Sequence, residues 1–368
     1  MTGPRLTSLA QTLPASVPFV GPEAQERTRG AAFAARLGAN ESVFGPSPKA
    51  IEAMQSAASE AWMYADPEAH DLKQALALRH KIAPQNIMVG EGIDGLLGTL
   101  VRLIVGRSDT VVTSDGAYPT FNYHVAGFGG ALHKVPYQGD FEDPSALFAK
   151  AAEINAKLVY IANPDNPMGT QIDGAVLTKA LDDLPAGCLL ILDEAYIDTA
   201  PAGSAPEIAI NDPRVIRMRT FSKAYGLAGA RVGYALGAPD LIEAFHKVRN
   251  HFGMSRISLA GAVAALADQD HLTETLAKIE TSRDRIAAIA VAHGLVPIPS
   301  ATNFVAVDCG QDGAFAARIL DGLIAEGIFV RMPFVAPQNR CIRVSCGTDD
   351  LMDLFETALP KALNVARG

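Results

Sequence analysis

The sequence has few cysteines, no metal-binding spacing of histidines and no long apolar run. Its four cysteines form no Cys-x-x-Cys pair, and its eight histidines show no His-x-x-x-His spacing. We therefore expect reduced thiols and no bound metal. The longest apolar stretches, such as Ala262 to Ala267, are far shorter than the roughly 18 residues of a membrane span. The first twenty residues lack the apolar segment of a secretory signal, so we expect a cytoplasmic protein without a membrane partner.

Charged residues are also sparse, at 19% of the chain, and acidic residues are in excess. The 31 Lys and Arg residues against 40 Asp and Glu give a net charge of -9, and no basic block occurs. This balance argues against nucleic acid as a partner, although a few placed cations could still bind small anions. With 368 residues, of which 49% are hydrophobic, the chain has enough apolar side chains for two folded domains.

From about residue 48 the sequence alternates short apolar runs with amphipathic segments, which predicts an α/β fold. Several runs are apolar throughout, as expected for strands of a mostly parallel sheet covered on both faces. Helices are expected at Gly95 to Val105 and Pro144 to Asn155. The predicted strands are Ile87 to Val89, Thr110 to Thr113, Leu132 to Val135, Leu158 to Ile161, Cys188 to Leu192, Val215 to Arg219 and Val232 to Leu236.

The pattern predicts three parts: an N-terminal arm at 1–40, a large domain at 41–245 and a smaller α+β domain at 246–368. The first part is rich in Pro, Gly and Ala. The last part is predicted to contain a long, interrupted helical tract, two strands and two further helices. These elements are Ser255 to His293, Phe304 to Val307, Ile342 to Ser345, Gly313 to Ala325 and Asp349 to Val365.

Polar clusters follow three of the predicted strands directly. They are Asn163 to Gly169, Asp193 to Tyr196 and Thr220 to Lys223. Because ligands of an open α/β sheet bind outside the carboxyl ends of the strands, we expect the three clusters to share one crevice. Asp193 follows a run of apolar residues, so its carboxylate is expected at the edge of the core and needs a cationic partner there.

A lysine and a carboxylate at neighbouring strand ends are what a pyridoxal 5'-phosphate site requires. The lysine amine forms a Schiff base, and the carboxylate keeps the pyridine nitrogen protonated. In these motifs, and in stretches from Arg36 to Thr348, the chain resembles the fold-type I pyridoxal phosphate aminotransferases of class I/II, in particular the histidinol-phosphate aminotransferases. The specific matches are Asn163 to Gly169, Asp193 to Tyr196 and Ser222 to Arg231.

The resemblance implies a role for each matching residue of the cofactor site. Lys223 would hold the cofactor covalently and then move a proton, and Asp193 would pair with the pyridinium nitrogen. Asn166 and Tyr196 would donate hydrogen bonds to the phenolate oxygen of the ring. An amino donor would leave its nitrogen on the cofactor, and a 2-oxo acid would then collect it.

Two aromatic residues match positions that contact the cofactor in the family. Phe121, within Tyr118-Pro-Thr-Phe, corresponds to an aromatic stacked on the ring. Tyr64, within Trp62-Met-Tyr, corresponds to a tyrosine that reaches the cofactor phosphate of the partner subunit. The resemblance therefore implies a homodimer with a shared active site.

The cofactor phosphate is expected at the start of a helix that follows a strand, where unpaired backbone N–H groups and the helix dipole favour an anion. Gly92, Ile93 and Asp94 would supply backbone donors. By resemblance, Ser222 and Arg231 complete this site.

Substrate binding is expected from the small domain and the arm. By resemblance, Arg343 binds the substrate carboxylate or phosphate, Arg331 is a second arginine on the phosphate side, and Asn40 also lies at the substrate. Phe19 stands where histidinol-phosphate enzymes commonly have a tyrosine that touches the phosphate. Because a phenylalanine offers no hydroxyl, we expect a shift toward apolar or aromatic amino acids.

Three alternatives remain open at this stage. A pyridoxal phosphate decarboxylase or lyase, such as a threonine-phosphate decarboxylase, would retain nearly every cofactor residue. An NAD-dependent oxidoreductase would use Gly90 to Gly95, which matches Gly-x-Gly-x-x-Gly, with Asp109 or Asp115 at the ribose. A non-catalytic regulator of this fold would need a DNA-binding domain, for which the arm is too short. Each residue also has an ordinary structural interpretation, such as a turn, a cap or an ion pair, and their joint placement favours the site.

Overall fold

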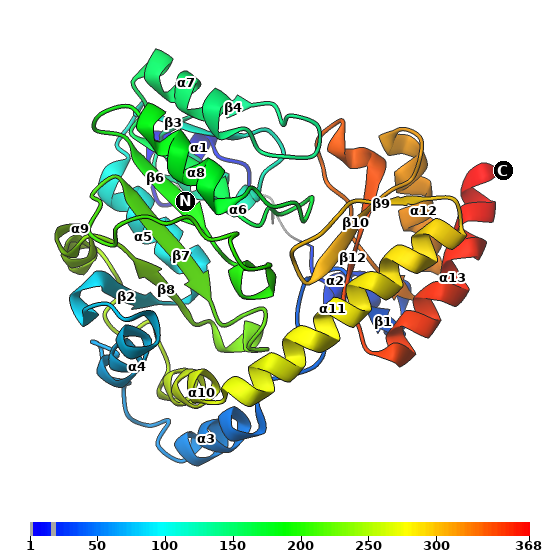
Figure 1. The fold of residues 1–368 in the computed structure, drawn as a ribbon, viewed down its shortest axis with the longest axis horizontal. Helices are drawn as coiled ribbons and strands as arrows, with labels where there is room; N and C mark the ends of the chain where they lie inside the picture. The colour runs from blue at the N-terminus through cyan, green and yellow to red at the C-terminus, as the bar shows by residue number, and fades with distance from the viewer. Residues whose placement is uncertain (1–2, 16–19) are drawn as a thin grey trace.

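The computed structural model describes residues 3–15 and 20–368, and its centre is a seven-stranded sheet (Figure 1). Only β8 runs opposite to the other strands of this sheet, so the sheet is mixed and mostly parallel. In spatial order the strands are β2 (Ile87–Gly90), β8 (Gly233–Leu236), β7 (Val215–Thr220), β6 (Leu189–Asp193), β5 (Leu158–Ala162), β3 (Thr110–Ser114) and β4 (Ala131–Val135).

The central strands are buried because helices cover both faces of the sheet. Along β5, Leu158 and Tyr160 pack with α5 (Gly92–Ile104) and α6 (Pro119–Gly127), while Val159 and Ile161 pack with α7 (Pro144–Ile154) and α8 (Gly174–Ala180). Successive side chains of a strand point to opposite faces, which explains this division. Both faces are therefore apolar, and the polar residues of this region gather at the strand ends.

A smaller unit lies beside the sheet, at the right of Figure 1. In it, β10 (Phe304–Asp308) pairs antiparallel with β12 (Cys341–Ser345) and β9 (Val296–Pro297). The helices α11 (Gln269–Ala292), α12 (Gly313–Ala325) and α13 (Asp349–Arg367) share one apolar core with these strands. The arm joins this unit, because β1 (Ala35–Arg36) pairs with β11 (Ile328–Phe329).

The remaining helices lie in the arm and around the sheet. They are α1 (Ser8–Thr12), α2 (Pro22–Arg29), α3 (Pro48–Ala58), α4 (His70–His80), α9 (Pro239–Ala244) and α10 (Arg256–Ala267). Short 3-10 helices occur at Pro84–Asn86, Leu181–Asp183, Ile197–Thr199, Ala228–Ala230, Phe245–Lys247 and Gln338–Arg340. Helix α10 packs on α3 and α4, which belong to the sheet side of the molecule. The expected division at residue 246 stays a prediction, and α10 lies with the elements that precede it.

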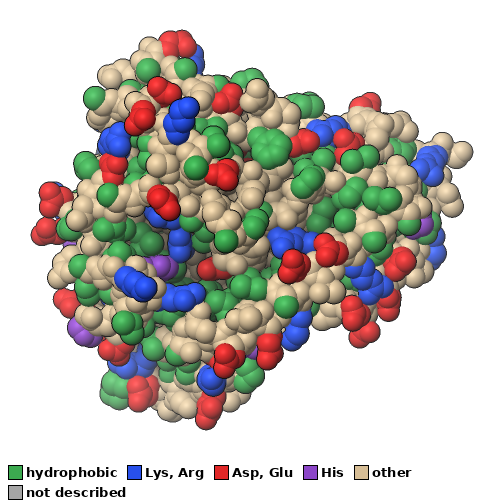
Figure 2. All heavy atoms as spheres, viewed as in Figure 1, with side chains coloured by type: hydrophobic (Ala, Val, Ile, Leu, Met, Phe, Trp, Pro, Cys, Tyr) green, Lys and Arg blue, Asp and Glu red, His purple; other side chains and the backbone are tan. Residues whose placement is uncertain are grey.

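The predicted α/β class and the mostly parallel sheet are confirmed. The predicted interruption of the helical tract from Ser255 to His293 falls at Asp268, between α10 and α11. Ser47 and Lys49 donate hydrogen bonds to the carboxylate of Asp268. In the parts of the chain that the structure describes, no helix has both the length and the apolar composition to cross a bilayer. On the face drawn in Figure 2, cationic and anionic side chains are interspersed.

Candidate active site

A cavity of about 330 Å³ lies at the carboxyl ends of β5, β6 and β7, and the smaller unit forms its other wall. The three polar clusters predicted from the sequence all contribute to it. Their members in the lining include Asn166, Asp193, Tyr196, Ser222 and Lys223. Parallel neighbouring strands bring their carboxyl ends to one edge, which explains why segments up to 60 residues apart in the chain meet here.

Asp193 ends β6, and its buried carboxylate lines the cavity. It accepts hydrogen bonds from the hydroxyl of Tyr160, 2.7 Å from Oδ2, and from the backbone N–H of Ala195, 3.0 Å from Oδ1. Burial raises the pKa of Asp193 to about 6. Among the described residues no lysine or arginine forms an ion pair with this carboxylate, so a cationic ligand group fits beside it.

Lys223 follows β7 and reaches the same cavity. Its amine donates a hydrogen bond to the backbone carbonyl of Asn40 at 3.0 Å and lies 5.4 Å from the centre of the Tyr196 ring. Burial, together with the nearby guanidinium of Arg343, lowers the pKa of Lys223 to about 8. A lysine with a lowered pKa has a larger share of the neutral amine, which is the nucleophilic form.

Tyr196 is the centre of a hydrogen-bonded group on the cavity wall. Its hydroxyl accepts from the side-chain amides of Asn40, at 3.0 Å, and Asn166, at 3.4 Å. Burial raises the pKa of Tyr196 to about 12, so this phenol stays protonated at neutral pH. It can therefore donate a hydrogen bond to an anionic oxygen in the cavity.

The N-terminus of α5 opens onto the cavity through Ile93 and Asp94, with Ser222 and Arg231 beside it. Gly92 has a positive φ of 76°, and a Cβ added there would lie 2.5 Å from Nη2 of Arg231. A side chain at this position would be strained by the backbone conformation and would have to displace the guanidinium of Arg231. Backbone N–H groups, a hydroxyl and a guanidinium together form a site for a phosphate group.

Two arginines of the smaller unit also line the cavity. Arg343 on β12 donates to Oδ1 of Asn166 at 2.5 Å and to the carbonyl of Gly38 at 3.3 Å, and Arg331 donates to the carbonyl of Val20 at 2.8 Å. In the described part of the chain the Nε atoms of both side chains are buried without a hydrogen-bond partner. Because both side chains line the cavity, their guanidinium groups are suited to bind an anionic substrate group.

Phe121 does not reach the cavity, contrary to the prediction that it stacks on the cofactor ring. Phe121 is fully buried beneath the sheet edge and stacks on Tyr160, with 4.8 Å between ring centres, and it is not part of the cavity lining. Tyr118, three residues earlier at the start of α6, lines the cavity instead. The physical reason is the helix start at Pro119, which turns Phe121 toward the core and leaves Tyr118 at the opening.

Tyr64, expected at the cofactor phosphate of a partner subunit, lies on the surface of this chain. Tyr64 is 76% exposed, and its ring lies 4.7 Å from that of Phe252 on the surface. Its expected role concerns a partner subunit and stays a prediction. Phe19 lies outside the described residues.

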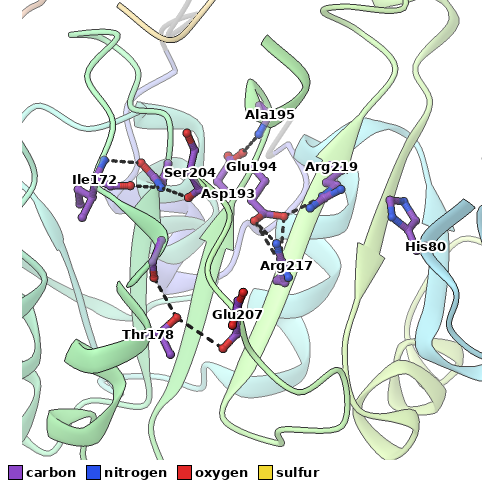
Figure 3. A network of polar contacts seen from close by, with 12 residues as sticks. His80, Ile172, Thr178, Asp193, Glu194, Ala195, Ser204, Glu207, Arg217 and Arg219 are labelled. Atoms are coloured by element: carbon purple, nitrogen blue, oxygen red, sulfur yellow. Dashed lines mark hydrogen bonds and ion pairs between the residues drawn. The ribbon is translucent and has the colours of Figure 1, made fainter. Parts of the chain in front are cut away.

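Sequence reasoning missed the ion pairs behind Asp193. The next residue, Glu194, is fully buried and points to Arg217 and Arg219, with N–O distances of 2.6 and 2.8 Å (Figure 3). Burial raises its pKa, but the two guanidinium groups outweigh burial and hold the pKa below the usual value. The sequence held one indication of these ion pairs, because positions 217 and 219 of β7 are both arginines on the same face of the strand. Glu194 directly follows β6, and both arginines lie on β7. The ion pairs therefore connect these two strands near the ends that Asp193 and Lys223 occupy.

The dinucleotide interpretation of Gly90 to Gly95 is wrong. Strand β2 lies at the edge of the sheet and pairs only with the antiparallel β8, so it is not part of a parallel βαβ unit. Asp109 and Asp115 form ion pairs with Lys157 and Lys134, outside the cavity.

Comparisons with known proteins agree with this geometry. The family model for aminotransferase class I and II matches residues 35–359. Curated histidinol-phosphate aminotransferases of Moorella thermoacetica and Anaeromyxobacter sp. are 31% and 35% identical to this chain. The first alignment covers 98% of this chain and 94% of the relative, and the second covers 84% and 85%.

A crystal structure of histidinol-phosphate aminotransferase from Sinorhizobium meliloti in complex with pyridoxal-5'-phosphate is 56% identical to this chain. It superposes with a TM-score of 0.96 and covers 99% of this chain and 98% of that chain. The resemblance found in the sequence motifs is thus confirmed, and the chain belongs to the aminotransferase class I and II family.

Proposed function

We propose that this chain is a pyridoxal 5'-phosphate-dependent aminotransferase that moves an amino group from histidinol phosphate to a 2-oxo acid. The observation that carries the proposal is the placement of Lys223 and Asp193 in one cavity, on neighbouring strand ends. The named relatives and the 56% identical structure support the same activity and cofactor.

The residues present fit this cofactor at each end. Asp193 is a buried carboxylate without a cationic partner in the described chain, as a pyridinium nitrogen requires. The start of α5 with Ser222 and Arg231 suits the phosphate, and Tyr118 offers a ring face. When bound, the cofactor supplies an aldehyde and a ring that accepts electrons.

The side chains of this chain then have distinct tasks. Lys223 would attach the cofactor and, once displaced, would take the proton from the substrate Cα and deliver it to the cofactor C4′, for which a pKa near 8 is suitable. Tyr196 and Asn166 orient the phenolate oxygen by donating hydrogen bonds to it. Arg343 and Arg331 hold the acidic groups of the substrate.

The proposal includes a homodimer with a shared site and a cytoplasmic location. Trp62 and Tyr64 are strongly exposed, and the tilted rings of Tyr64 and Phe252 lie 4.7 Å apart, so this apolar patch is available to a second copy. The four cysteines are all buried and unpaired, which is typical of proteins in a reducing compartment.

Aromatic amino acids are a second candidate class of donor, because Phe19 replaces a tyrosine expected near the substrate phosphate. Donor profiling separates the two. Purified protein with the cofactor and 2-oxoglutarate is supplied with histidinol phosphate, phenylalanine, tyrosine or histidine, and glutamate and carbon dioxide are measured. We expect the largest kcat/KM with histidinol phosphate. A preference for phenylalanine or tyrosine would support the second class, and carbon dioxide without glutamate would support a decarboxylase.

A further inference from the structure

Asn40 is the residue through which the arm, the smaller unit and the sheet side of the cavity meet. It is buried and has a left-handed backbone with a φ of 56°. Asparagine tolerates this region better than most residues, but the conformation still needs support from its surroundings. The backbone conformation decides where the carbonyl of Asn40 points.

Ser345, at the end of β12, supports Asn40 with two hydrogen bonds. Its hydroxyl accepts from the backbone N–H of Asn40 at 3.0 Å and donates to Oδ1 of the same residue at 2.9 Å. The donation to Oδ1 leaves the amide nitrogen of Asn40 directed at the hydroxyl of Tyr196. Ser345 lies two residues after Arg343, so both side chains are on the same face of the strand.

Asn303, directly before β10, contacts the other side of Asn40. Its side-chain amide donates to the carbonyl of Asn40 at 3.0 Å, and the amine of Lys223 donates to the same oxygen at the same distance. The two donors use both acceptor positions of this carbonyl. In the described chain, Oδ1 of Asn303 is buried without a partner. The side-chain amide nitrogen also donates to the carbonyl of Glu41 at 3.5 Å, so both of its contacts are with the segment that carries Asn40.

We infer that Asn303 and Ser345 are positioning residues of the active site. They hold Asn40 so that its carbonyl receives the amine of Lys223 and its side chain holds the hydroxyl of Tyr196. Both come from the smaller unit, whereas Lys223 and Tyr196 follow strands of the large sheet. The inference rests on the proposed role of Lys223.

The carbonyl of Asn40 is one of several groups that act on the Lys223 amine. Burial and Arg343 lower its pKa, Glu41 raises it, Arg231 lowers it and Asp193 raises it. An acceptor favours the protonated amine, since the ammonium group donates the stronger hydrogen bond. Displacement of the Asn40 carbonyl should therefore lower the pKa of Lys223 further.

The experiment uses the full chain, with and without cofactor, and the variants N303L and S345A. Leucine preserves the volume of Asn303 and removes the donor, and S345T restores a hydroxyl. N86A and S282A are controls, because Asn86 and Ser282 are also buried and hydrogen-bonded but lie away from the cavity. In the cofactor-free chain, the pKa of Lys223 is obtained from the pH dependence of its acylation, followed by mass spectrometry of the labelled peptide.

We expect the pKa of Lys223 to fall by about one unit in N303L and S345A. We also expect kcat to fall about tenfold, with a smaller rise in the donor KM, because Asn303 and Ser345 act through Asn40, which is itself expected at the substrate. S345T should recover most of both values, and N86A and S282A should retain them. Wild-type values of the Lys223 pKa and kcat in N303L and S345A would overturn the inference, as would equal changes in the controls. Failure of the proposed function is distinct, since the wild type itself would then form no glutamate.

Discussion

The hydroxyl of Tyr160 lies 2.7 Å from Oδ2 of Asp193 and donates a hydrogen bond to it. The bond is made within the sheet, between β5 and β6, where both side chains are buried. It favours the charged form of Asp193, whereas burial raises the pKa of this carboxyl to about 6. The proposed pairing with a pyridinium nitrogen needs that charged form.

Replacement of Tyr160 by phenylalanine tests this bond through the pH dependence of cofactor binding. In the wild type, affinity for pyridoxal 5'-phosphate should weaken as the pH falls through about 6, because Asp193 becomes protonated. In Y160F the pKa of Asp193 rises, and the loss should begin about one pH unit higher. Equilibrium dialysis over a pH series measures the shift. Y123F is the control, since Tyr123 is exposed, and identical profiles for Y160F and the wild type would contradict the role of Tyr160.

Gly92 is the position that most directly tests the phosphate site. In G92A the new Cβ would lie 2.5 Å from Nη2 of Arg231, and the φ of 76° would be strained. We expect the affinity for pyridoxal 5'-phosphate to fall at least about tenfold. G127A is a matched control, because a Cβ at Gly127 meets no atom within 4 Å. Unchanged cofactor affinity in G92A would mean that the phosphate binds elsewhere.

The ion pairs of Glu194 should matter mainly for stability. In E194Q the partly buried arginines at 217 and 219 lose their shared, fully buried carboxylate, so we expect the free energy of unfolding at pH 7 to fall by about 3–5 kcal/mol. The control E153Q removes an exposed ion pair with Lys150 and should change the free energy of unfolding by less than about 1 kcal/mol. Urea unfolding measures both. Equal effects of the two variants would show that the buried pairs add nothing beyond a surface pair.

Arg331 should discriminate between a donor with a phosphate group and a donor with a carboxylate. In R331M the KM for histidinol phosphate should rise about tenfold or more, because the cavity loses one of two guanidinium groups that can pair with the phosphate. The KM for phenylalanine should change by less than about threefold, since its singly charged carboxylate can pair with Arg343 alone. The variant R107M, at an exposed position, should leave both values unchanged. A uniform rise for both donors would mean that Arg331 binds the anionic group of either donor, phosphate or carboxylate.

The sequence predicts much of this fold because the relevant signals are local. Apolar runs such as Leu158 to Ile161 differ from the observed strand by one residue at most. The polar residues after Ala162, Leu192 and Arg219 mark the cavity, since parallel strands must bring those ends together. The family resemblance then supplies roles that spacing alone does not.

The remaining features depend on contacts between distant segments. The hydrogen bond from Asn303 to Asn40 joins residues 263 positions apart, and no local pattern announces it. Tyr160 was detectable in principle, as the one residue with a hydroxyl in an otherwise apolar run. Phe121 was misplaced for a different reason, because the register of a helix start decides which of two aromatic residues faces the cavity.

The central claim is that Lys223 carries the cofactor, and chemical trapping tests it most directly. The full chain is incubated with pyridoxal 5'-phosphate, reduced with borohydride and digested, and the labelled peptide is identified by mass spectrometry. We predict one reduced adduct at Lys223, its loss in K223A, and wild-type labelling in K247A, where the replaced lysine is exposed. An adduct on a different lysine, or normal labelling of K223A, would contradict the account.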